Sequence, residues 1–229
     1  MPSPARTTGA AYDRIADRWL DDRFSREDGV AQHRRALSFL ADSGPGFALN
    51  AGCGCNTRFN GMLRERGLGI EGLDISRCMV ELARASDPDV IVHHADVCEW
   101  VPSREYRFIT AWDSLWHVPL AEQRPVMLKL MSSLEPGGVF IFSAGGTDAP
   151  GEHTESFMGP EVYYSTLGIS GIVEVVREAG CLCRHLELDQ RPSSHLYVIS
   201  QMAGRALDRS VSAILAGNPD RLGLRPEPV

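Results

Sequence analysis

Between residues 47 and 143 the chain alternates short apolar runs with segments of helical periodicity, and this alternation is the strongest constraint on its fold. The apolar runs cover residues 47–51, 70–73, 90–94, 108–112 and 139–143, and the helical patterns cover 58–66, 76–85 and 121–134. Strands that alternate with helices form a mainly parallel sheet with helices on both faces. We therefore predict an α/β fold.

The two ends of the chain depart from this alternation. Helical patterns at 10–24 and 30–42 precede the first strand. After a helix at 169–179, extended runs at 181–189 and 195–201 are joined by only a short link. So short a link cannot hold a crossover helix, and the last two strands are therefore predicted to be antiparallel.

Residues 145–168 interrupt the rhythm, because they are rich in glycine, proline and polar residues. A long loop in a compact domain is typical of a lid or a substrate-binding loop. The chain after residue 202 has one weak helical pattern to residue 216 and a proline-rich end. We divide the chain into N-terminal helices at 1–45, a core at 46–202 with a substrate loop at 145–168, and a partly disordered tail at 203–229.

Composition narrows the class of partner. A net charge of −7 and a pI of about 5.5 argue against nucleic acid, because phosphate binding requires a basic face. No apolar run approaches the ~20 residues of a membrane helix, and the first residues lack the apolar region of a signal peptide. The six cysteines are typical of a reducing compartment. We predict a cytoplasmic protein that acts on a small molecule, not on nucleic acid or membrane, as a monomer or homodimer.

The turn after the first strand contains two glycines, Gly52 and Gly54. Glycine lacks a Cβ and tolerates positive φ, so the backbone can approach a ligand closely. In an α/β sheet this turn lies where nucleotides bind. Asp74, at the end of the second strand, is placed to accept hydrogen bonds from both hydroxyls of a ribose. These features suit NAD and S-adenosylmethionine (SAM) equally, since both contain adenosine.

Three other features separate the two cofactors. The third predicted strand ends in His94-Ala95-Asp96-Val97, the motif Pro136-Gly137-Gly138 precedes the fifth, and the sheet closes with an antiparallel pair. Together with the glycine turn, these features over residues 10–202 resemble the class I SAM-dependent methyltransferases. The segment 114–119 resembles their small-molecule branch. The resemblance implies a Rossmann-like, seven-stranded, mostly parallel sheet with a C-terminal antiparallel hairpin.

The resemblance implies which residues hold the adenosine part of SAM. Asp74 matches the acid that binds the ribose diol. Ile75 and Met79 match apolar residues near the adenine. Asp96 and Val97 match the carboxylate and the backbone amide that bind the adenine edge.

It also implies the contacts of the methionine part. Gly52 and Gly54 match the motif that wraps it, and Tyr12 matches a tyrosine that closes over the SAM carboxylate from the N-terminal helix. Asp113 falls where the fourth strand meets the methyl-donor site. In this arrangement the helices at 1–45 cap the cofactor site.

Two residues depart from the family pattern, which has aspartate at position 50 and glycine at position 56. Asn56 is the kind of non-glycine residue that best adopts the left-handed conformation. Asn50 removes a negative charge near the cationic amino group of SAM. We therefore predict that Asn50→Asp binds SAM at least as tightly as the natural chain. Isothermal titration calorimetry measures this, and a large loss of affinity would contradict the alignment.

His117 and Asp113 are the candidate catalytic residues. An unperturbed histidine pKa of about 6.5 suits a general base near neutrality. The alternative is that His117 packs beside the sulfonium and orients the loop. Asp113 is placed to hydrogen-bond the acceptor or the amino group of SAM.

Substrate contacts are predicted near the expected acceptor pocket. Trp112 and Trp116 either wall a pocket for a flat acceptor or belong to the core. Arg191 either pairs with an acidic substrate or is an ordinary exposed loop residue. The predicted substrate-contact residues are Trp116, His153, Tyr163, Tyr164, Arg191 and His195.

Other classes of function remain as alternatives. The Cys53/Cys55 and Cys181/Cys183 pairs lack the spacing of a zinc site, so no metal is predicted. A nicotinamide-dependent oxidoreductase explains the glycines and Asp74 only. A catalytically silent SAM-binding protein is the other alternative. The predicted activity is transfer of a methyl group from SAM to an oxygen or nitrogen atom of a small molecule by in-line displacement.

Overall fold

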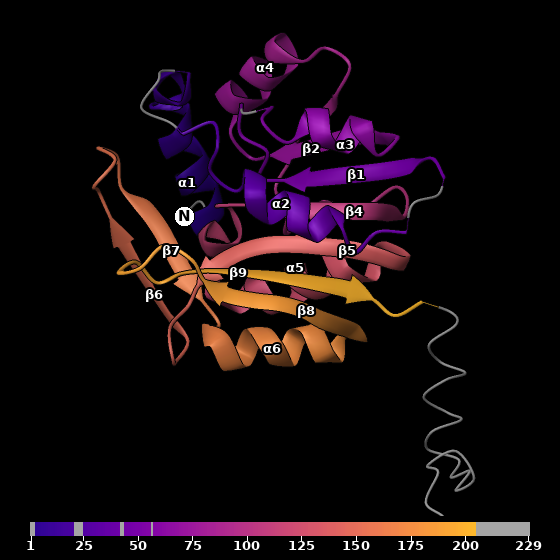
Figure 1. Ribbon diagram of the computed structural model, residues 1–229. Helices are drawn as coiled ribbons and strands as arrows, with labels where there is room; N and C mark the ends of the chain where they lie inside the picture. Colours follow the sequence, from indigo (N-terminus) through magenta and orange to yellow (C-terminus); the bar gives the residue numbers. More distant parts are fainter. Residues whose placement is uncertain (1–2, 21–24, 42–43, 56, 205–229) are drawn as a thin grey trace, which may run out of the picture.

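The centre of the computed structural model is a seven-stranded sheet in the order β3-β2-β1-β4-β5-β9-β8 (Figure 1). The structure describes residues 3–20, 25–41, 44–55 and 57–204. The strands are β1 Gly46–Ala51, β2 Leu68–Asp74, β3 Ile91–His94, β4 Tyr106–Ala111, β5 Leu134–Gly145, β8 Cys181–Leu188 and β9 His195–Met202. The first five are parallel and β9 is antiparallel to both of its neighbours. The predicted fold class is confirmed.

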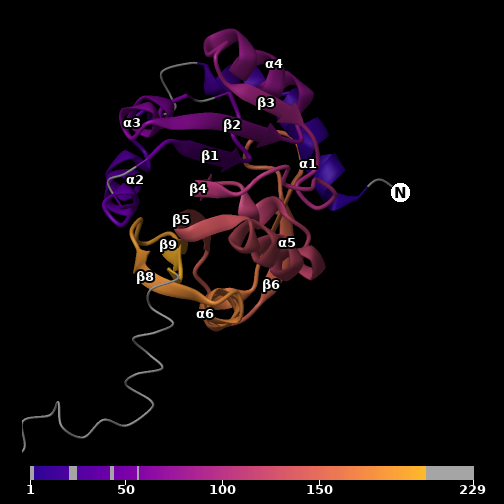
Figure 2. The same ribbon diagram turned by 90° about the vertical axis from the view of Figure 1, so that its right-hand side faces the viewer.

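Alternating side chains of the strands build a core on each face of the sheet. On β5, Phe140 and Phe142 pack with α5 and α6, whereas Val139 and Ile141 pack with α2 and α3. Figure 2 shows α2 and α3 on one side of the sheet and α5 on the other. The helices are α1 Pro4–Asp13, α2 Val30–Leu37, α3 Asn60–Glu65, α4 Arg77–Ser86, α5 Leu120–Ser132 and α6 Gly168–Glu178, with short 3₁₀ helices η1 Ala16–Trp19 and η2 Leu115–His117.

The first predicted helix, 10–24, is wrong in its bounds. Helix α1 starts at Pro4, where the Ser3 hydroxyl accepts a hydrogen bond from the amide of Arg6 and proline occupies the first turn. It ends at Asp13, and the separate η1 follows after Ile15, whose φ of −124° is not helical. The apolar spacing continues across this break and conceals it. The rest of that prediction, at 21–24, and the tail helix lie outside the described residues.

The predicted loop at 145–168 contains a β-hairpin instead. Strand β6 Gly151–Glu155 pairs antiparallel with β7 Val162–Thr166. All five residues of β6 are exposed, so this strand has no apolar alternation that the sequence could reveal. In Figure 1 this hairpin and α1 lie at the same end of the sheet, at the carboxyl ends of the parallel strands.

Helix α2 is fixed to the sheet by a buried histidine, His33. Its Nδ1 donates to the carbonyl oxygen of Gly29 (2.7 Å), and its Nε2 accepts from the hydroxyl of Thr110 (2.7 Å). The ring stacks on Phe59 with 3.6 Å between centroids. Burial lowers the pKa of His33 to about 3, so this side chain is neutral in the folded protein.

His33 makes the stability of the fold dependent on pH. Below pH 6.5 the unfolded chain binds a proton that the folded chain excludes, so the free energy of unfolding falls as pH falls toward 3. One such histidine accounts for at most about 1.4 kcal/mol per pH unit in that window. In thermal unfolding from pH 7 to 4, His33→Gln should therefore lose stability less steeply than the natural chain. His185→Gln, on β8, is the control, and equal slopes for all three chains would contradict the prediction.

Candidate functional site at the carboxyl ends of the strands

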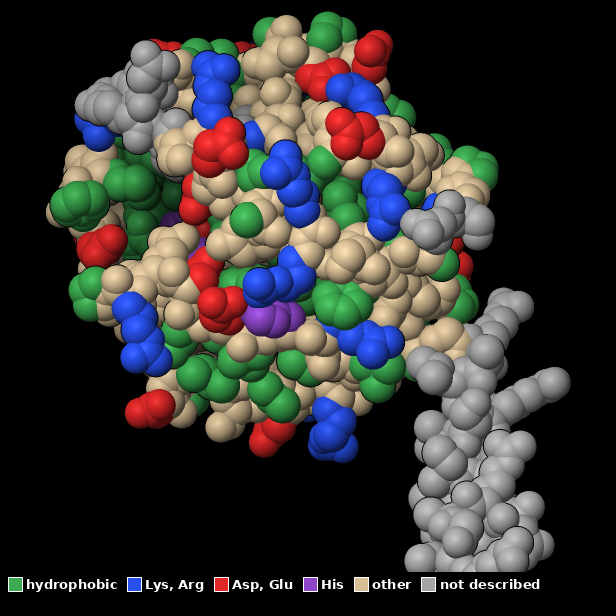
Figure 3. Space-filling model, in the orientation of Figure 1, with side chains coloured by type: hydrophobic (Ala, Val, Ile, Leu, Met, Phe, Trp, Pro, Cys, Tyr) green, Lys and Arg blue, Asp and Glu red, His purple; other side chains and the backbone are tan. Residues whose placement is uncertain are grey.

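A cavity of about 1050 Å³ lies at the carboxyl ends of β1, β2 and β4. It extends from the glycine turn to the β6–β7 hairpin and the loop before β9. In Figure 3 the surface is hollowed on the left, at the end of the molecule that carries α1 and the hairpin. The predicted site residues that line the cavity are Tyr12, Asn50, Gly52, Gly54, Asp74, Ile75, Met79, Asp96, Val97, Asp113, Trp116, His117, His153, Tyr164 and His195. Tyr163 and Arg191 are predicted site residues outside this lining.

The two glycines of the turn are needed for different reasons. Gly52 has φ +73°, and a Cβ added there would lie 2.2 Å from the Cβ of Ser114. Gly54 has φ +54°, and an added Cβ would meet no atom within 4 Å. Gly52 therefore permits two loops of the protein to pack together. Gly54 leaves open a cradle of the kind that a cofactor fills.

Asp74 is held by the backbone on both of its oxygens. Its Oδ2 accepts from the amide of Gly54 and its Oδ1 from the amide of Ser76, each at 2.8 Å. Burial raises the pKa of this carboxyl, and the two amide bonds oppose that rise. A carboxylate has about four acceptor positions. Two of them are thus left for the ribose hydroxyls of a nucleoside in the cavity.

The residues predicted to contact the adenine lie after β2 and β3. The apolar side chains of Ile75 and Met79 line the cavity beside Asp96 and Val97. Asp96 Oδ1 accepts from the amide of Cys98 (2.9 Å), which orients the carboxylate. Helix α1 lies directly on this part, since a Cβ on Gly9 would be 3.1 Å from Ile75 Cγ2. The donors, acceptors and apolar walls present here fit an adenosine.

His117 joins three elements of the site by hydrogen bonds. Its Nδ1 donates to the carbonyl oxygen of Tyr163 on β7 (2.8 Å). Its Nε2 accepts from the hydroxyl of Tyr12 on α1 (2.8 Å) and from the indole N–H of Trp116 (3.1 Å). Burial lowers the pKa of His117 to about 4. With these partners the neutral ring joins α1 and the hairpin to η2. Of the two roles predicted from sequence, general base and orientation of the loop, this arrangement favours the second.

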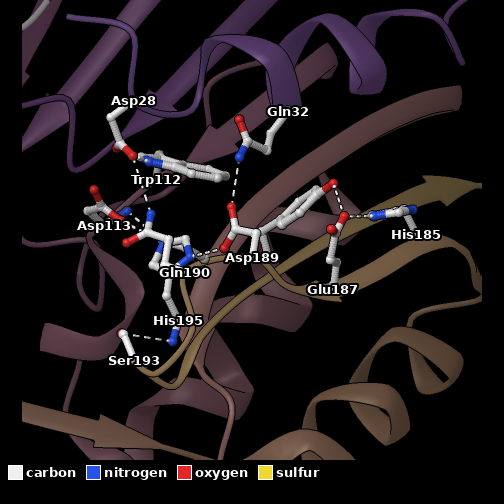
Figure 4. Close-up of polar contacts among 12 residues, drawn as sticks. Asp28, Gln32, Trp112, Asp113, His185, Glu187, Asp189, Gln190, Ser193 and His195 are labelled. Carbon is white, nitrogen blue, oxygen red and sulfur yellow. Dashed lines mark hydrogen bonds and ion pairs between the residues drawn. The ribbon is translucent and has the colours of Figure 1, made fainter. Parts of the chain in front are cut away.

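A second histidine, His195, lies between two carboxylates. Its Nδ1 is 2.5 Å from Asp189 Oδ1 and its Nε2 is 3.2 Å from Asp113 Oδ1 (Figure 4). The side chain of His195 is 5% exposed. Asp28 lies close by, where it accepts from the indole N–H of Trp112 (2.9 Å) and from the side-chain amide of Gln190 (3.3 Å).

Sequence reasoning missed Asp28 and Asp189. Both are polar residues in connecting segments, Asp28 before α2 and Asp189 after β8. Neither belongs to a motif. The fold brings Asp28 to Trp112 and Asp189 to His195, and these two rings lie 5.2 Å apart between centroids. Asp189 is the last residue of the predicted strand 181–189, and this position is the one signal that could have drawn attention to it.

The aromatic residues predicted at the site lie in different environments. Trp112 is buried in the core on the α2 side of the sheet and also lines the cavity. Tyr164 stacks on His153 with 5.3 Å between centroids, so these two form a wall from the β6–β7 hairpin. The Tyr163 hydroxyl donates to Glu152 Oε2 (2.5 Å) and supports the hairpin. Arg191 is exposed.

Neither a metal-binding cluster nor a membrane-spanning helix is found in the described part of the chain. No group of three or more His, Cys, Asp or Glu side chains there could hold a metal ion. Within the same residues, no helix combines the length and apolar character needed to cross a bilayer. All six cysteines are free thiols. The cytoplasmic location stays a prediction.

Comparison with known proteins identifies the type of domain. A family model described as a methyltransferase domain matches residues 25–166, more than half of the chain. No curated protein sequence matches the chain.

Solved structures share the fold. A SAM-dependent methyltransferase from Mesorhizobium loti is 20% identical, with a TM-score of 0.59, and the match covers 76% of this chain and 99% of that one. The CcbJ methyltransferase from Streptomyces caelestis is 16% identical, with a TM-score of 0.63 over 87% of this chain and 99% of that one. The 1,6-didemethyltoxoflavin-N1-methyltransferase from Burkholderia thailandensis is 17% identical, with a TM-score of 0.63 over 89% and 92%. Its structure contains 1,6-didemethyltoxoflavin and S-adenosylhomocysteine.

Proposed function

This chain belongs to the methyltransferase-domain family, and on that basis we propose that it moves the methyl group of SAM to a nitrogen or oxygen atom of a small molecule. The size and continuity of the cavity support this proposal most directly. The cavity of about 1050 Å³ is continuous from the glycine turn to the acidic and aromatic end at Asp113. Pockets for a single small ligand measure roughly 300–1,000 Å³. The volume of this cavity exceeds the upper end of that range, which supports a site that holds the cofactor and an acceptor together.

The residues present fit SAM as the cofactor. Asp74 is free to accept from the ribose hydroxyls, Asp96 from the adenine amino group, and Gly54 leaves room beside the turn for the methionine part. When bound, SAM supplies an electrophilic methyl group on a sulfonium, with the sulfur as leaving group. Asn50, 6% exposed on β1, lines the same part of the cavity.

The chain's own contribution is to align the acceptor and exclude water. Helix α1 and the β6–β7 hairpin close over the cavity, and His117 joins them through Tyr12 and Tyr163. An acceptor held behind the methyl group in a near-attack arrangement gains much of its rate from orientation. Exclusion of water keeps its nucleophilic atom desolvated. In this proposal His117 is a positioning residue, and Asp113 contacts the acceptor or the amino group of SAM.

The acceptor atom is proposed to be nitrogen or oxygen. Among structures with this fold are the toxoflavin N1-methyltransferase and a glycopeptide N-methyltransferase complexed with S-adenosylhomocysteine. These give support to nitrogen acceptors. The walls from Trp116, His153 and Tyr164 suit a flat or cyclic small molecule.

Two measurements test the proposed function. Isothermal titration calorimetry with SAM and with NAD should give binding of SAM alone, whereas binding of NAD alone would indicate the oxidoreductase. Incubation with methyl-labelled SAM and a panel of phenols, catechols, primary amines and amino sugars should then release S-adenosylhomocysteine. SAM binding without release across the panel would indicate a catalytically silent binding protein.

A further inference from the structure

His195 has the geometry of a proton acceptor that a carboxylate holds in place. It is the first residue of β9, and its side chain is almost fully buried. A carboxylate oxygen only accepts hydrogen bonds, so the 2.5 Å contact makes Nδ1 the donor to Asp189. This bond fixes the ring and directs Nε2 into the cavity, which His195 lines. Figure 4 shows the ring between Asp189 and Asp113.

The contact on the other side of the ring depends on protonation. Nε2 lies 3.2 Å from Asp113 Oδ1, and a carboxylate only accepts, so this contact is a hydrogen bond only when Nε2 carries a proton. In the neutral ring Nε2 is an acceptor without a donor from Asp113, and Asp113 Oδ1 accepts from the hydroxyl of Ser143 (3.1 Å). The lone pair of Nε2 can therefore accept the proton of an acceptor's N–H or O–H.

Asp113 is held at this position by an unusual backbone conformation. It has φ +55°, in the left-handed region, and it is the sole described residue other than glycine with positive φ. Its amide donates to Ser143 Oγ (2.7 Å), which fixes the strained turn. Strain of this kind concentrates at functional sites.

His117, the histidine singled out from sequence, offers no comparable proton acceptor. The lone pair of its Nε2 already receives two donors, from Tyr12 and Trp116. Its Nδ1 is committed to the carbonyl oxygen of Tyr163. Protonation of Nε2 would end its role as acceptor of these two hydrogen bonds.

We propose that His195 is the general base of methyl transfer and that Asp189 is its positioning residue; this inference rests on the proposed function. The acceptor's heteroatom forms a bond to the methyl carbon while the bond from that carbon to sulfur breaks and its electron pair stays on sulfur. The proton of the acceptor's N–H or O–H passes to Nε2 of His195. The imidazolium formed lies between Asp113 and Asp189, whose two negative charges stabilise it.

The charges around His195 set the sign of its pH dependence. Burial by itself would lower the pKa of His195, but hydrogen bonds to Asp113 and Asp189 outweigh it, and the pKa is raised. Asp28 is the third carboxylate on this side, beyond the ring of Trp112. The neutral ring is the form that accepts a proton. kcat/KM should therefore rise with pH through a value above 6.5.

The first test needs no acceptor. Proton NMR titration of the histidine ring signals in the whole chain, assigned by comparison with His195→Gln, should give a pKa above 6.5 for His195. In Asp189→Asn that pKa should fall by about 1 unit or more, since a carboxylate partner is lost. A pKa at or below 6.5, or one that Asp189→Asn does not change, would overturn the inference.

The second test uses the panel acceptor that the natural chain methylates fastest. His195→Gln should lower kcat about 100-fold or more and remove the inflection in the pH profile, while the Kd for SAM in calorimetry stays within a few-fold. Asp189→Asn should lower kcat and move the inflection to lower pH. His185→Gln, which loses a histidine paired with Glu187 on β8 outside the cavity lining, is the matched control and should behave as the natural chain.

The two proposals fail in different ways. If the natural chain does not bind SAM, the proposed function fails. If His195→Gln binds SAM and keeps the natural kcat and inflection, only the role of His195 as the base fails.

Discussion

Gly52→Ala is expected to destabilise the chain by about 3 kcal/mol, as measured by urea unfolding. The added Cβ would lie 2.2 Å from Ser114 Cβ, far inside contact distance, so one of the two loops must move. Overpacking of this kind costs about 1–3 kcal/mol, and a non-glycine residue at φ +73° adds roughly 1–2 kcal/mol. Because this turn also forms the proposed cofactor cradle, SAM affinity should fall with stability.

Gly54→Ala is the matched control, because it adds a side chain at positive φ without a steric clash with the protein. Its Cβ meets no protein atom within 4 Å, so the loss of stability should be limited to about 1–2 kcal/mol from φ +54°. The methyl group does enter the cradle, and SAM affinity should therefore fall sharply in a chain that still folds. The double variant Gly52→Ala/Ser114→Gly should recover part of the stability lost by Gly52→Ala. Equal destabilisation by the two single glycine variants would contradict this account.

Asp74→Ala is expected to weaken SAM binding about 100-fold or more in calorimetry. The substitution removes the proposed acceptor of two ribose hydroxyls, and hydrogen bonds to a charged group contribute roughly 1.5–3 kcal/mol each. It also removes the partner of the Gly54 and Ser76 amides, so the turn loses its anchor.

Asp13→Asn provides the control for Asp74→Ala. Asp13 is a nearby carboxylate that accepts from the Ser76 hydroxyl (2.6 Å) and the Cys78 amide (2.9 Å), but it does not line the cavity. Its substitution should change SAM affinity by no more than a few-fold. An unchanged affinity in Asp74→Ala would show that the ribose lies elsewhere.

The sheet was predictable because its central strands, such as β1 and β4, are buried and apolar. The runs that became β1, β2 and β4 lie between clear turn residues, and the short link at 190–194 predicted the antiparallel β8–β9 pair. The β6–β7 hairpin was not predictable from periodicity, since β6 is polar and exposed along its whole length. Its partner β7 and the contact with η2 hold it in place, and these are long-range effects.

The site was predictable where a residue type follows a strand at a defined place. Asp74, Asp96 and Asp113 all follow this rule, and all three line the cavity. The hydrogen-bond partners of His117 and His195 could not be predicted from sequence by this rule. Asp189 and Tyr163 reach His195 and His117 through backbone geometry that no local pattern encodes.

The two amide bonds to Asp74 have a thermodynamic consequence. Both bonds form within the protein, so the fold itself holds the glycine turn and the start of α4 in the place where we propose that the nucleoside of SAM binds. A ligand that arrives there does not have to order this part of the backbone. The conformational entropy of that segment is lost during folding, and we therefore expect the affinity for SAM to be correspondingly greater.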